Sequence, residues 1–276
     1  MSISLVTTCK GRLEHLKATI DSWIAFGPDE IIVVDVDCPD GTKGWLASHH
    51  PNVRCVSLAS TSFNLAQARN AGAESAVSDY VFFVDADIVL DKELNGWLKQ
   101  HLSPGKYFSR KRDHAYDGIH EQGTVLCHHS DFKKIEGYDT SFCGYGGEDH
   151  DLYFKLQRIG IQKVDVPKRH INSLDHSDEQ RTEFYAEKNK FKQSIINRSY
   201  SAIKAKILAE RPGLGELPQT TRSEIWHAVS TNIKPGFENL EGPITSIKFA
   251  SQKWAPEPYY LEINHQVSVS IKRRKP

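Results

Sequence analysis

Two aspartates one residue apart follow an apolar run and are the residues of this chain best suited to chemistry. The run Tyr-Val-Phe-Phe-Val at 80–84 leads directly into Asp85-Ala86-Asp87. Its length and its β-branched and aromatic residues are typical of a strand buried on both faces. Carboxylates at the end of such a strand repel each other unless a cation lies between them. Such oxygen ligands suit Mg²⁺ or Mn²⁺, which commonly hold substrate phosphates, although a plain surface turn is the alternative.

Three other polar segments have positions that suit the same site. Residues 7–12 follow the first predicted strand, and residues 35–37 follow the second. Residues 144–151 (Gly-Tyr-Gly-Gly-Glu-Asp-His-Asp) form a loop and the acidic first turn of a predicted helix. The carboxyl ends of parallel strands meet at one edge of a sheet, so the first two segments and the aspartate pair should share a crevice. The acids of the last segment would also suit the first turn of a helix. Together with glycines and an aromatic residue they exceed what capping needs, which favours a functional role.

The order of these motifs resembles that of GT-A-fold nucleotide-sugar glycosyltransferases of the family 2 type. Val-Val-Asp-x-Asp at 33–37, Ala-Arg-Asn-x-Gly at 68–72 and Phe-Val-Asp-Ala-Asp at 83–87 match that family's pattern, as does the opening strand. Residues 144–151 resemble the acceptor-side motif of β-1,4-galactosyltransferases, chondroitin-polymerase-like enzymes and polypeptide N-acetylgalactosaminyltransferases. The resemblance covers roughly residues 1–200.

The resemblance implies a divalent metal as cofactor, Mn²⁺ or else Mg²⁺. Asp87 would bind it directly, and Asp85 would face the ribose of the donor or the metal shell. His176 matches the histidine that completes the metal site in galactosyltransferase-like members, with an exposed loop or cap residue as the alternative. Those members carry a further methionine ligand three residues earlier, where this chain has Ser173. A histidine nitrogen among oxygen ligands makes Mn²⁺ the first choice.

The resemblance also implies residues that bind the sugar nucleotide. Asp35 or Asp37 would accept hydrogen bonds from the base or the ribose, and Thr7 and Arg12 would border the nucleotide. Arg69 would lie near the donor sugar or phosphate, with a buried ion pair as an equal alternative.

The segment at 144–151 supplies the remaining site residues that the resemblance implies. Tyr145 stands where an aromatic residue, usually tryptophan, stacks on a sugar, and Gly147 is assigned to the binding site with it. Asp149 would be the general base on the far side of the anomeric carbon, and Glu148 would bind acceptor or donor hydroxyls. Attack from that side inverts the configuration through an oxocarbenium-like state, while a metal neutralises the departing diphosphate.

The predicted activity is therefore inverting, metal-dependent transfer of a hexose or N-acetylhexosamine from a UDP-sugar to a glycan or a lipid-linked glycan, as in polysaccharide biosynthesis. A non-catalytic sugar- or nucleotide-binding module is an alternative. A sugar-1-phosphate nucleotidyltransferase is less favoured, because such enzymes need a glycine-rich loop for the triphosphate and residues 7–12 contain one glycine.

The scaffold that must position these residues is an α/β fold. Strand and helix signals alternate through the first half and predict a mostly parallel sheet flanked by helices, with strands at 3–7, 31–34, 53–58 and 80–84 and helices at 13–24, 43–48 and 64–76. Farther on, the pattern predicts helices at 92–101, 131–135, 148–159 and 178–210, strands at 123–128 and 162–166, and an irregular segment at 106–120.

We divide the chain into a catalytic domain at 1–210 and a mainly helical or irregular extension at 211–276. Within the catalytic domain, residues 1–105 form the half that binds the nucleotide sugar, and residues 106–210 form the acceptor half. The break falls at Arg-Pro-Gly-Leu-Gly, residues 211–215, where proline and glycine end a helical pattern.

Composition limits the partners and the compartment. The 276 residues hold 35 Lys and Arg against 35 Asp and Glu, so the chain has no basic excess for nucleic acid. Five cysteines without Cys-x-x-Cys spacing indicate free thiols of the cytoplasm. Neither a signal peptide nor a membrane span is expected. A weak peripheral contact between the basic tail at 272–275 and the inner face of the membrane is a further prediction.

Overall fold

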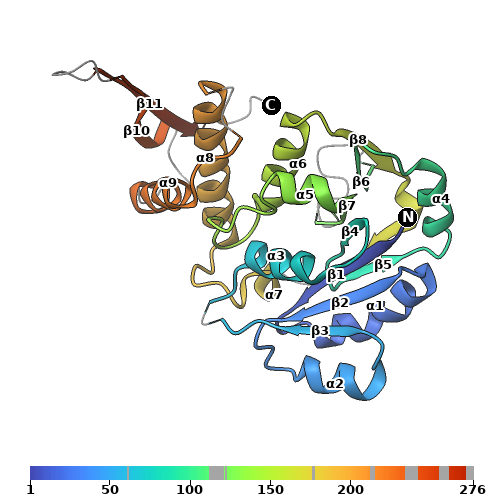
Figure 1. Ribbon diagram of the computed structural model, residues 1–276. Helices are drawn as coiled ribbons and strands as arrows, with labels where there is room; N and C mark the ends of the chain where they lie inside the picture. Colours follow the sequence, from blue (N-terminus) through green and yellow to red (C-terminus); the bar gives the residue numbers. More distant parts are fainter. Residues whose placement is uncertain are drawn as a thin grey trace, which may run out of the picture. The chain divides into compact units, whose positions relative to one another are not determined.

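The computed structural model describes residues 1–60, 62–111, 121, 123–175, 178–211, 215–233, 242–254 and 261–271. The chain forms two compact units (Figure 1). The first unit consists of residues 1–139 and 148–188, and the second of residues 140–147 and 189–276. Residues 189–210 thus group with the second unit, whereas the sequence placed them in the catalytic domain; the domain boundaries themselves stay a prediction.

The first unit is built on a seven-stranded sheet with the order β3-β2-β1-β4-β7-β6-β8. Its strands are β1 (Ile3–Cys9), β2 (Glu30–Asp35), β3 (Arg54–Ser57), β4 (Tyr80–Phe83), β6 (Lys106–Arg110), β7 (Val125–His128) and β8 (Gln162–Val166). Only β7 runs against its neighbours, since it pairs antiparallel with both β4 and β6. The mostly parallel α/β sheet is therefore confirmed.

Strand β6 corrects the prediction of an irregular segment at 106–120. Its residues Tyr107, Phe108 and Ser109 are all buried, but charged residues flank them on both sides. A buried stretch of three residues is too short to give a periodic signal in a single sequence. Residues 112–120 of that segment lie outside the described part of the chain.

Helices cover both faces of the sheet, as Figure 1 shows for α1 and α3. The helices of the first unit are α1 (Leu13–Phe26), α2 (Thr42–His49), α3 (Leu65–Ser75), α4 (Leu94–His101), α5 (His129–Lys134), α6 (Glu148–Arg158) and α7 (Asp178–Thr182). Successive residues of β1 point to opposite faces, so Leu5 joins the apolar cluster around Trp23 of α1, and Val6 joins the cluster around the alanines of α3. These two apolar layers fix the sheet edge that carries the predicted site.

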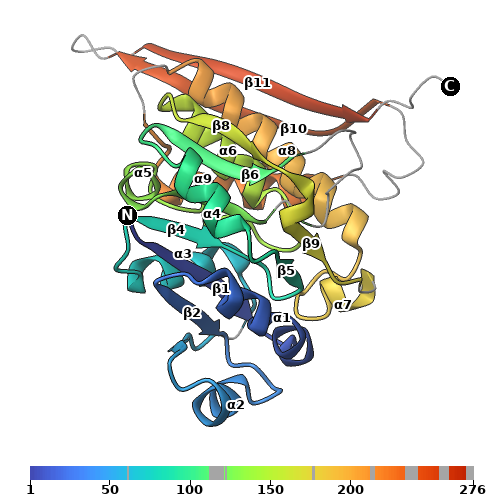
Figure 2. The ribbon, with the colours of Figure 1, turned by 90° about the vertical axis from the view of Figure 1, so that its right-hand side faces the viewer.

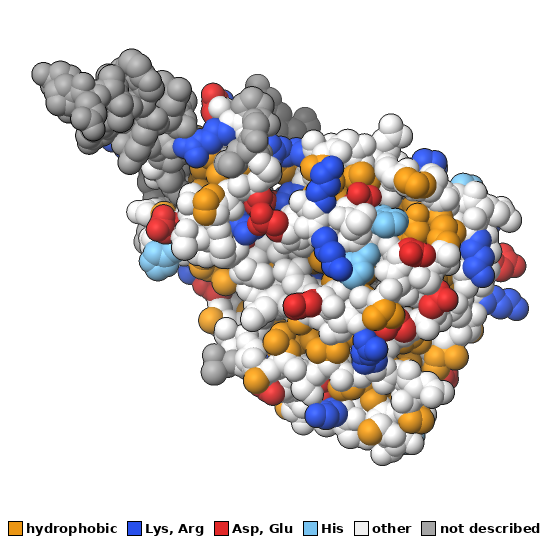
Figure 3. Space-filling model, viewed as in Figure 1, with side chains coloured by type: hydrophobic (Ala, Val, Ile, Leu, Met, Phe, Trp, Pro, Cys, Tyr) orange, Lys and Arg blue, Asp and Glu red, His pale blue; other side chains and the backbone are white. Residues whose placement is uncertain are grey.

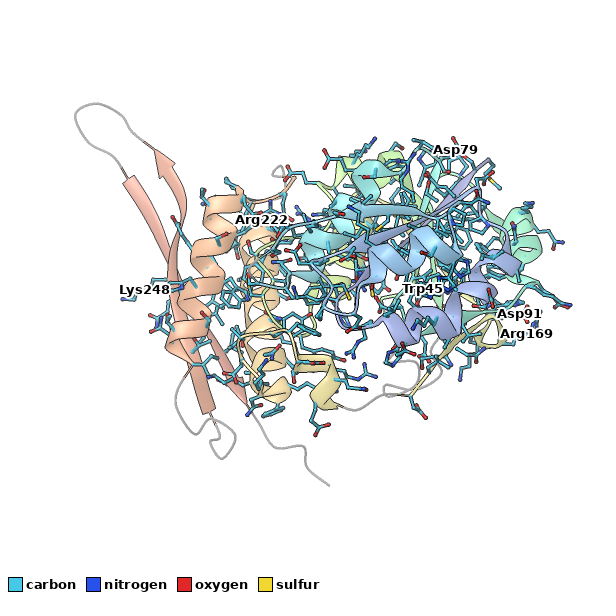
Figure 4. The ribbon with its side chains drawn as sticks, turned by 90° about the horizontal axis from the view of Figure 1, so that it is seen from below. Trp45, Asp79, Asp91, Arg169, Arg222 and Lys248 are labelled. Atoms are coloured by element: carbon cyan, nitrogen blue, oxygen red, sulfur yellow. The ribbon has the colours of Figure 1, made fainter. Side chains whose placement is uncertain are left out.

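A small two-stranded sheet, β5 (Ile88–Leu90) with β9 (Ile171–Ser173), was not predicted. Asp91 follows β5, and its backbone N–H donates to the carbonyl of His170 just before β9 at 3.0 Å. Asp91 and Arg169 lie side by side there (Figure 4). Leu174 N, just after β9, also donates to the carbonyl of Asp87 at 2.8 Å. The segment that follows the aspartate pair is therefore held by hydrogen bonds to residues 170–174.

The second unit contains α8 (Lys190–Ala209), α9 (Gln219–Asn232) and an antiparallel ribbon of β10 (Gly242–Trp254) and β11 (Leu261–Ile271), seen along its length in Figure 2. The single helix predicted at 178–210 is wrong, because α7 ends at 182 and α8 begins at 190. The Asn189 side chain accepts a hydrogen bond from Lys192 N at 2.9 Å and caps the new helix. The ribbon likewise corrects the prediction of a mainly helical or irregular extension.

No helix in the described part of the chain is long and apolar enough to cross a membrane. On the face drawn in Figure 3, acidic and basic side chains are interspersed, in keeping with the equal numbers of Lys plus Arg and Asp plus Glu.

Candidate active site

The aspartate pair lies in a tight turn at the end of β4. Val84 continues the strand by donating to the carbonyl of Val6, and Ile88 N donates to the carbonyl of Asp85 at 3.0 Å to close the turn. The Oδ1 atom of Asp85 accepts a hydrogen bond of 2.7 Å from Nη2 of Arg69. The turn therefore presents both carboxylates at the carboxyl end of the central strands, where open α/β sheets bind their ligands.

Arg69 of α3 is the centre of the charged cluster. The residue is only 2% exposed, and its Nη1 donates to Oδ1 of Asp149 at 2.7 Å and lies 3.6 Å from Oε1 of Glu148. Its guanidinium carbon lies 5.1 Å from the centre of the Tyr138 ring. Of the two roles left open for Arg69, the structure supports the buried ion pair directly.

The packing of α3 explains why Arg69 reaches this position. Asn64 caps the helix by accepting from Gln67 N at 2.9 Å. A Cβ on Gly72 would lie 2.4 Å from Cγ1 of Val6, so only glycine lets α3 approach β1 this closely. The Ala-Arg-Asn-x-Gly motif thus combines a close helix–strand contact with an arginine aimed at the strand ends.

The cluster shifts the pKa values of its acids. Burial raises the pKa of Glu148 to about 8, and the neighbouring Asp149 carboxylate adds to this shift while Arg69 opposes it. Burial also raises the pKa of Asp85; Arg69 opposes that shift, and Asp87 and Asp149 reinforce it. The pKa of Arg69 is raised, because the surrounding carboxylates outweigh its burial. A Glu148 with such a pKa is largely protonated near neutral pH and can donate a hydrogen bond as well as accept one.

Three glycines with positive φ angles precede the two acids Glu148 and Asp149 in the sequence. Glu148 and Asp149 open α6, and the preceding Gly144, Gly146 and Gly147 have φ angles of 82°, 79° and 106°. These left-handed values favour glycine, so the loop cannot be formed by an ordinary run of residues. Tyr145 and Gly147 belong to the second unit, and the next residue in the sequence, Glu148, belongs to the first.

The predicted donor-side carboxylates shape the loops after β2. The two oxygens of Asp35 accept hydrogen bonds from Cys38 N at 2.7 Å and Lys43 N at 2.9 Å. Asp37 has a φ of 43°, and its Oδ2 accepts from Ser60 N at 2.8 Å. Both side chains thus lie at the expected sheet edge, with backbone donors already bound. Their contact with a base or ribose stays a prediction.

Thr7 lies near the end of β1, and Arg12 lies just after that strand. Burial lowers the pKa of Arg12, while the nearby Asp87 carboxylate opposes that shift, so the β1 loop and the aspartate turn converge as expected. Arg12 also donates from Nη2 to the carbonyl of Gln180. Thr7 is buried, and its hydroxyl has no hydrogen-bond partner among the described residues. A Cβ on Gly11 would lie 2.1 Å from the Phe184 ring, so the segment after α7 packs on this loop.

The carboxylates of Asp85 and Asp87 are the type of ligand that a hard divalent cation prefers. Burial raises the pKa of Asp85 and the charge of Asp87 adds to that shift, so the charge of a bound cation would relieve the repulsion between these two carboxylates. Within the described residues, no group of three His, Cys, Asp or Glu side chains is arranged to hold a metal. His176, the predicted third ligand, lies outside the described residues. Of the three expected ligands, Asp85 and Asp87 are the two that lie within the described residues.

Two residues of the cluster were not anticipated from the sequence. The Tyr138 ring contacts the Arg69 guanidinium, and its hydroxyl is buried without a hydrogen-bond partner among the described residues. A Cβ on Gly123 would lie 2.3 Å from both Nη2 of Arg69 and Oδ2 of Asp85. A tyrosine and a glycine outside any motif give no signal of such contacts, which only the fold creates.

Comparisons with known proteins agree with this geometry. A model of glycosyl transferase family 2 matches residues 4–134, and a model described as the N-terminal domain of galactosyltransferase matches residues 108–177. β-1,4-galactosyltransferase 5 of Danio rerio is 31% identical over 116 residues, which cover 38% of this chain and 29% of that protein. β-1,4-galactosyltransferase 4 of Rattus norvegicus is 30% identical over 123 residues, 40% of this chain and 35% of that protein. The matched segment therefore spans about a third of the length of these relatives.

Solved structures show the same fold. A crystal structure of S. aureus TarS superposes with a TM-score of 0.56 at 15% identity, over 87% of this chain and 74% of that chain. The mannosyltransferase PcManGT from Pyrobaculum calidifontis, in complex with GDP-Man and Mn²⁺, gives 0.55 at 16% identity, over 83% and 69%. The motif order, the sheet and the two family models, which together match residues 4–177, confirm the resemblance of this chain to the GT-A-fold glycosyltransferases of family 2.

Proposed function

We propose that this protein is an inverting, metal-dependent glycosyltransferase that moves a hexose or N-acetylhexosamine from a UDP-sugar to a glycan. The observation that carries the proposal is the convergence of Asp85, Asp149 and Glu148 on Arg69 at the carboxyl edge of the sheet. It joins the aspartate pair expected on the donor side to the acids expected on the acceptor side.

The donor class rests on the relatives. The curated matches are β-1,4-galactosyltransferases, and the same fold holds UDP-GlcNAc in a structure of S. aureus TarS with a TM-score of 0.50. A divalent cation on Asp85 and Asp87, Mn²⁺ by preference, would neutralise charge on the departing diphosphate. The remaining chemistry belongs to side chains of this chain.

Asp149 is the proposed base. Arg69 engages its Oδ1, so the orientation of the carboxylate is fixed while Oδ2 takes the proton of the acceptor hydroxyl. The acceptor oxygen then bonds to the anomeric carbon as the bond from that carbon to the diphosphate oxygen breaks. The electron pair leaves with UDP, and the configuration inverts. Glu148, protonated near neutral pH, donates to a sugar hydroxyl or to the acceptor.

The acceptor of the proposed reaction is a glycan, with a lipid-linked glycan as the form that would bring the protein to the cytoplasmic face of a membrane. The basic residues expected to touch that membrane, 272–275, lie outside the described residues. Flotation with anionic liposomes, with and without residues 272–276, tests this contact separately from catalysis.

Sugar transfer is tested with a panel of nucleotide sugars and oligosaccharide acceptors in Mn²⁺, by UDP release and by NMR of the product anomer. Asp149→Asn keeps the shape and the acceptor for Arg69 but removes the base. We expect about 10²- to 10⁴-fold slower transfer with unchanged donor binding in a thermal-shift assay. Asp165→Asn, an exposed acid of β8, is the matched control and should transfer normally. Retention of configuration, wild-type turnover by Asp149→Asn, or full activity in chelator would overturn the proposal.

A further inference from the structure

The loop of Tyr145 is held by one face of α8. Three residues of that helix, Lys190, Gln193 and Asn197, are spaced three and four apart, which places them on the same face. The Lys190 ammonium lies 4.9 Å from the centre of the Tyr145 ring, and the Gln193 side chain accepts a hydrogen bond from Tyr145 N. The same helix therefore contacts the ring and the backbone of one residue.

Asn197 donates hydrogen bonds to three carbonyls of this loop. Its Nδ2 donates to the carbonyls of Gly146 at 2.6 Å, Cys143 at 3.2 Å and Tyr145 at 3.3 Å. The residue is 0% exposed, so water cannot replace these bonds. A Cβ on Gly147 would lie 3.0 Å from Cβ of Asn197, which shows how closely the loop approaches the helix.

Trp226 of α9 sets the direction of the Asn197 amide. The indole Nε1 donates to Oδ1 of Asn197 at 2.8 Å. Indole N–H is a donor only, so it binds the oxygen of the amide and never the nitrogen. The nitrogen is thereby turned toward the three carbonyls. Without Trp226 the amide could rotate by half a turn and present its oxygen to carbonyl oxygens, which repel it.

We infer that Trp226 and Asn197 are positioning residues that fix Tyr145 as a preformed surface for a sugar ring of the acceptor. The inference rests on the proposed function and extends it to α8 and α9. Tyr145 lies four residues before Asp149 in the chain. Aromatic faces bind sugars with little loss of entropy when the ring is already immobile. The bonds from α8 and α9 supply that immobility.

The test compares Trp226→Phe with Val229→Ala. Trp226→Phe keeps a ring but removes the indole donor, whereas Val229→Ala removes buried packing from the same helix and leaves the indole donor in place. For Trp226→Phe we expect amide exchange at residues 143–147 to become about tenfold faster. We also expect the acceptor KM to rise about five- to tenfold, with the donor KM within twofold of wild type. Val229→Ala should lower Tm but leave both readouts unchanged.

A double-mutant cycle separates positioning from general damage. In a Tyr145→Ala background, Trp226→Phe should cause no further rise in the acceptor KM, because the surface that it fixes is gone. Equal exchange in Trp226→Phe and wild type, or a parallel rise of donor and acceptor KM, would overturn the inference while wild-type transfer stands. Absence of transfer by the wild type is a different outcome, since it rejects the proposed function and the acceptor role with it.

Discussion

Nη1 of Arg69 donates a hydrogen bond of 2.7 Å to Oδ1 of Asp149 and so joins the middle of α3 to the first turn of α6. Its Nη2 binds Asp85 at the same distance. The guanidinium is planar and always charged, so it sets the separation of the two carboxylates rigidly. The distance between the proposed base and the donor-side acids is thus fixed before any substrate binds.

Replacing Arg69 with methionine should lower the free energy of unfolding by about 3–5 kcal/mol at pH 8, because the buried carboxylates lose their counter-charge. The loss should be smaller at pH 5, since Glu148 is then protonated and adds no charge to the cluster. Urea denaturation at the two pH values measures both effects.

The control for this variant is Lys206→Met. Lys206 pairs with Glu210 at 2.6 Å on the exposed side of α8, and its loss should cost about 0.5 kcal/mol or less. An Arg69→Met loss as small as that of Lys206→Met, or one that does not depend on pH, would contradict a stabilising role for the buried cluster.

Much of the first unit could be predicted from its sequence, because its signals are local. Apolar runs such as 80–84 and helical spacing such as 13–24 give strands and helices by themselves, and the observed β4 and α1 agree closely. Strand β6 and the break between α7 and α8 could not be found, because a short buried stretch and a single capping asparagine compete with stronger neighbouring patterns.

The acids of the site could be predicted for the same reason, since they stand in two local motifs, one at 83–87 and the other at 144–151. The arrangement of these acids around Arg69 could not be predicted from the sequence. Arg69 meets Asp149 only because α3 packs on β1 through Gly72, and Tyr138 meets Arg69 only in the folded chain. Long-range contacts of this kind leave no trace in spacing along the sequence.

Glu148→Gln tests the raised pKa of Glu148. The folded pKa of about 8 lies above the ordinary 4.5, so the native state holds the proton more tightly between these values. Stability of the wild type should therefore fall as pH rises through this window, by up to about 1.4 kcal/mol per pH unit from this group. Gln carries no proton to lose, so the variant should gain stability relative to wild type from pH 5 to pH 8. Parallel urea curves at all pH values would contradict this.

Gly123→Ala tests whether the ion pair between Arg69 and Asp85 requires the close approach of Gly123. The added methyl would lie 2.3 Å from Nη2 of Arg69 and from Oδ2 of Asp85, so the pair must move apart. We expect a loss of about 1–3 kcal/mol and a fall in transfer activity, measured by denaturation and by UDP release. Gly96→Ala in α4 is the matched control, because nothing lies within 4 Å of its Cβ position. There the helix should gain up to about 1 kcal/mol, and a similar gain at Gly123 would show that the cluster tolerates the methyl.

Cys38 is the thiol that the structure marks as reactive. Its sulfur lies 3.9 Å from that of Cys9 and accepts a hydrogen bond from Gly11 N at 3.1 Å. The hydrogen bond with Cys9 lowers the pKa of Cys38 to about 5, although burial opposes this shift, so we expect this half-buried residue to be a thiolate at neutral pH. The N–H of Cys38 also binds Asp35, so a group attached to this sulfur would crowd the loop expected to hold the nucleotide.

Alkylation of Cys38 by iodoacetamide, followed by mass spectrometry of its peptide, should therefore proceed at a rate that is nearly constant from pH 6.5 to pH 9. Glutathione under the same conditions reacts faster as pH rises toward its ordinary thiol pKa near 8.5. Cys9→Ala removes the donor and should move the midpoint for Cys38 upward, whereas Cys55→Ala should leave it in place. Modified protein should bind UDP-sugars more weakly in the thermal-shift assay. A Cys38 rate that climbs with pH in parallel with glutathione would show that Cys9 does not stabilise the thiolate.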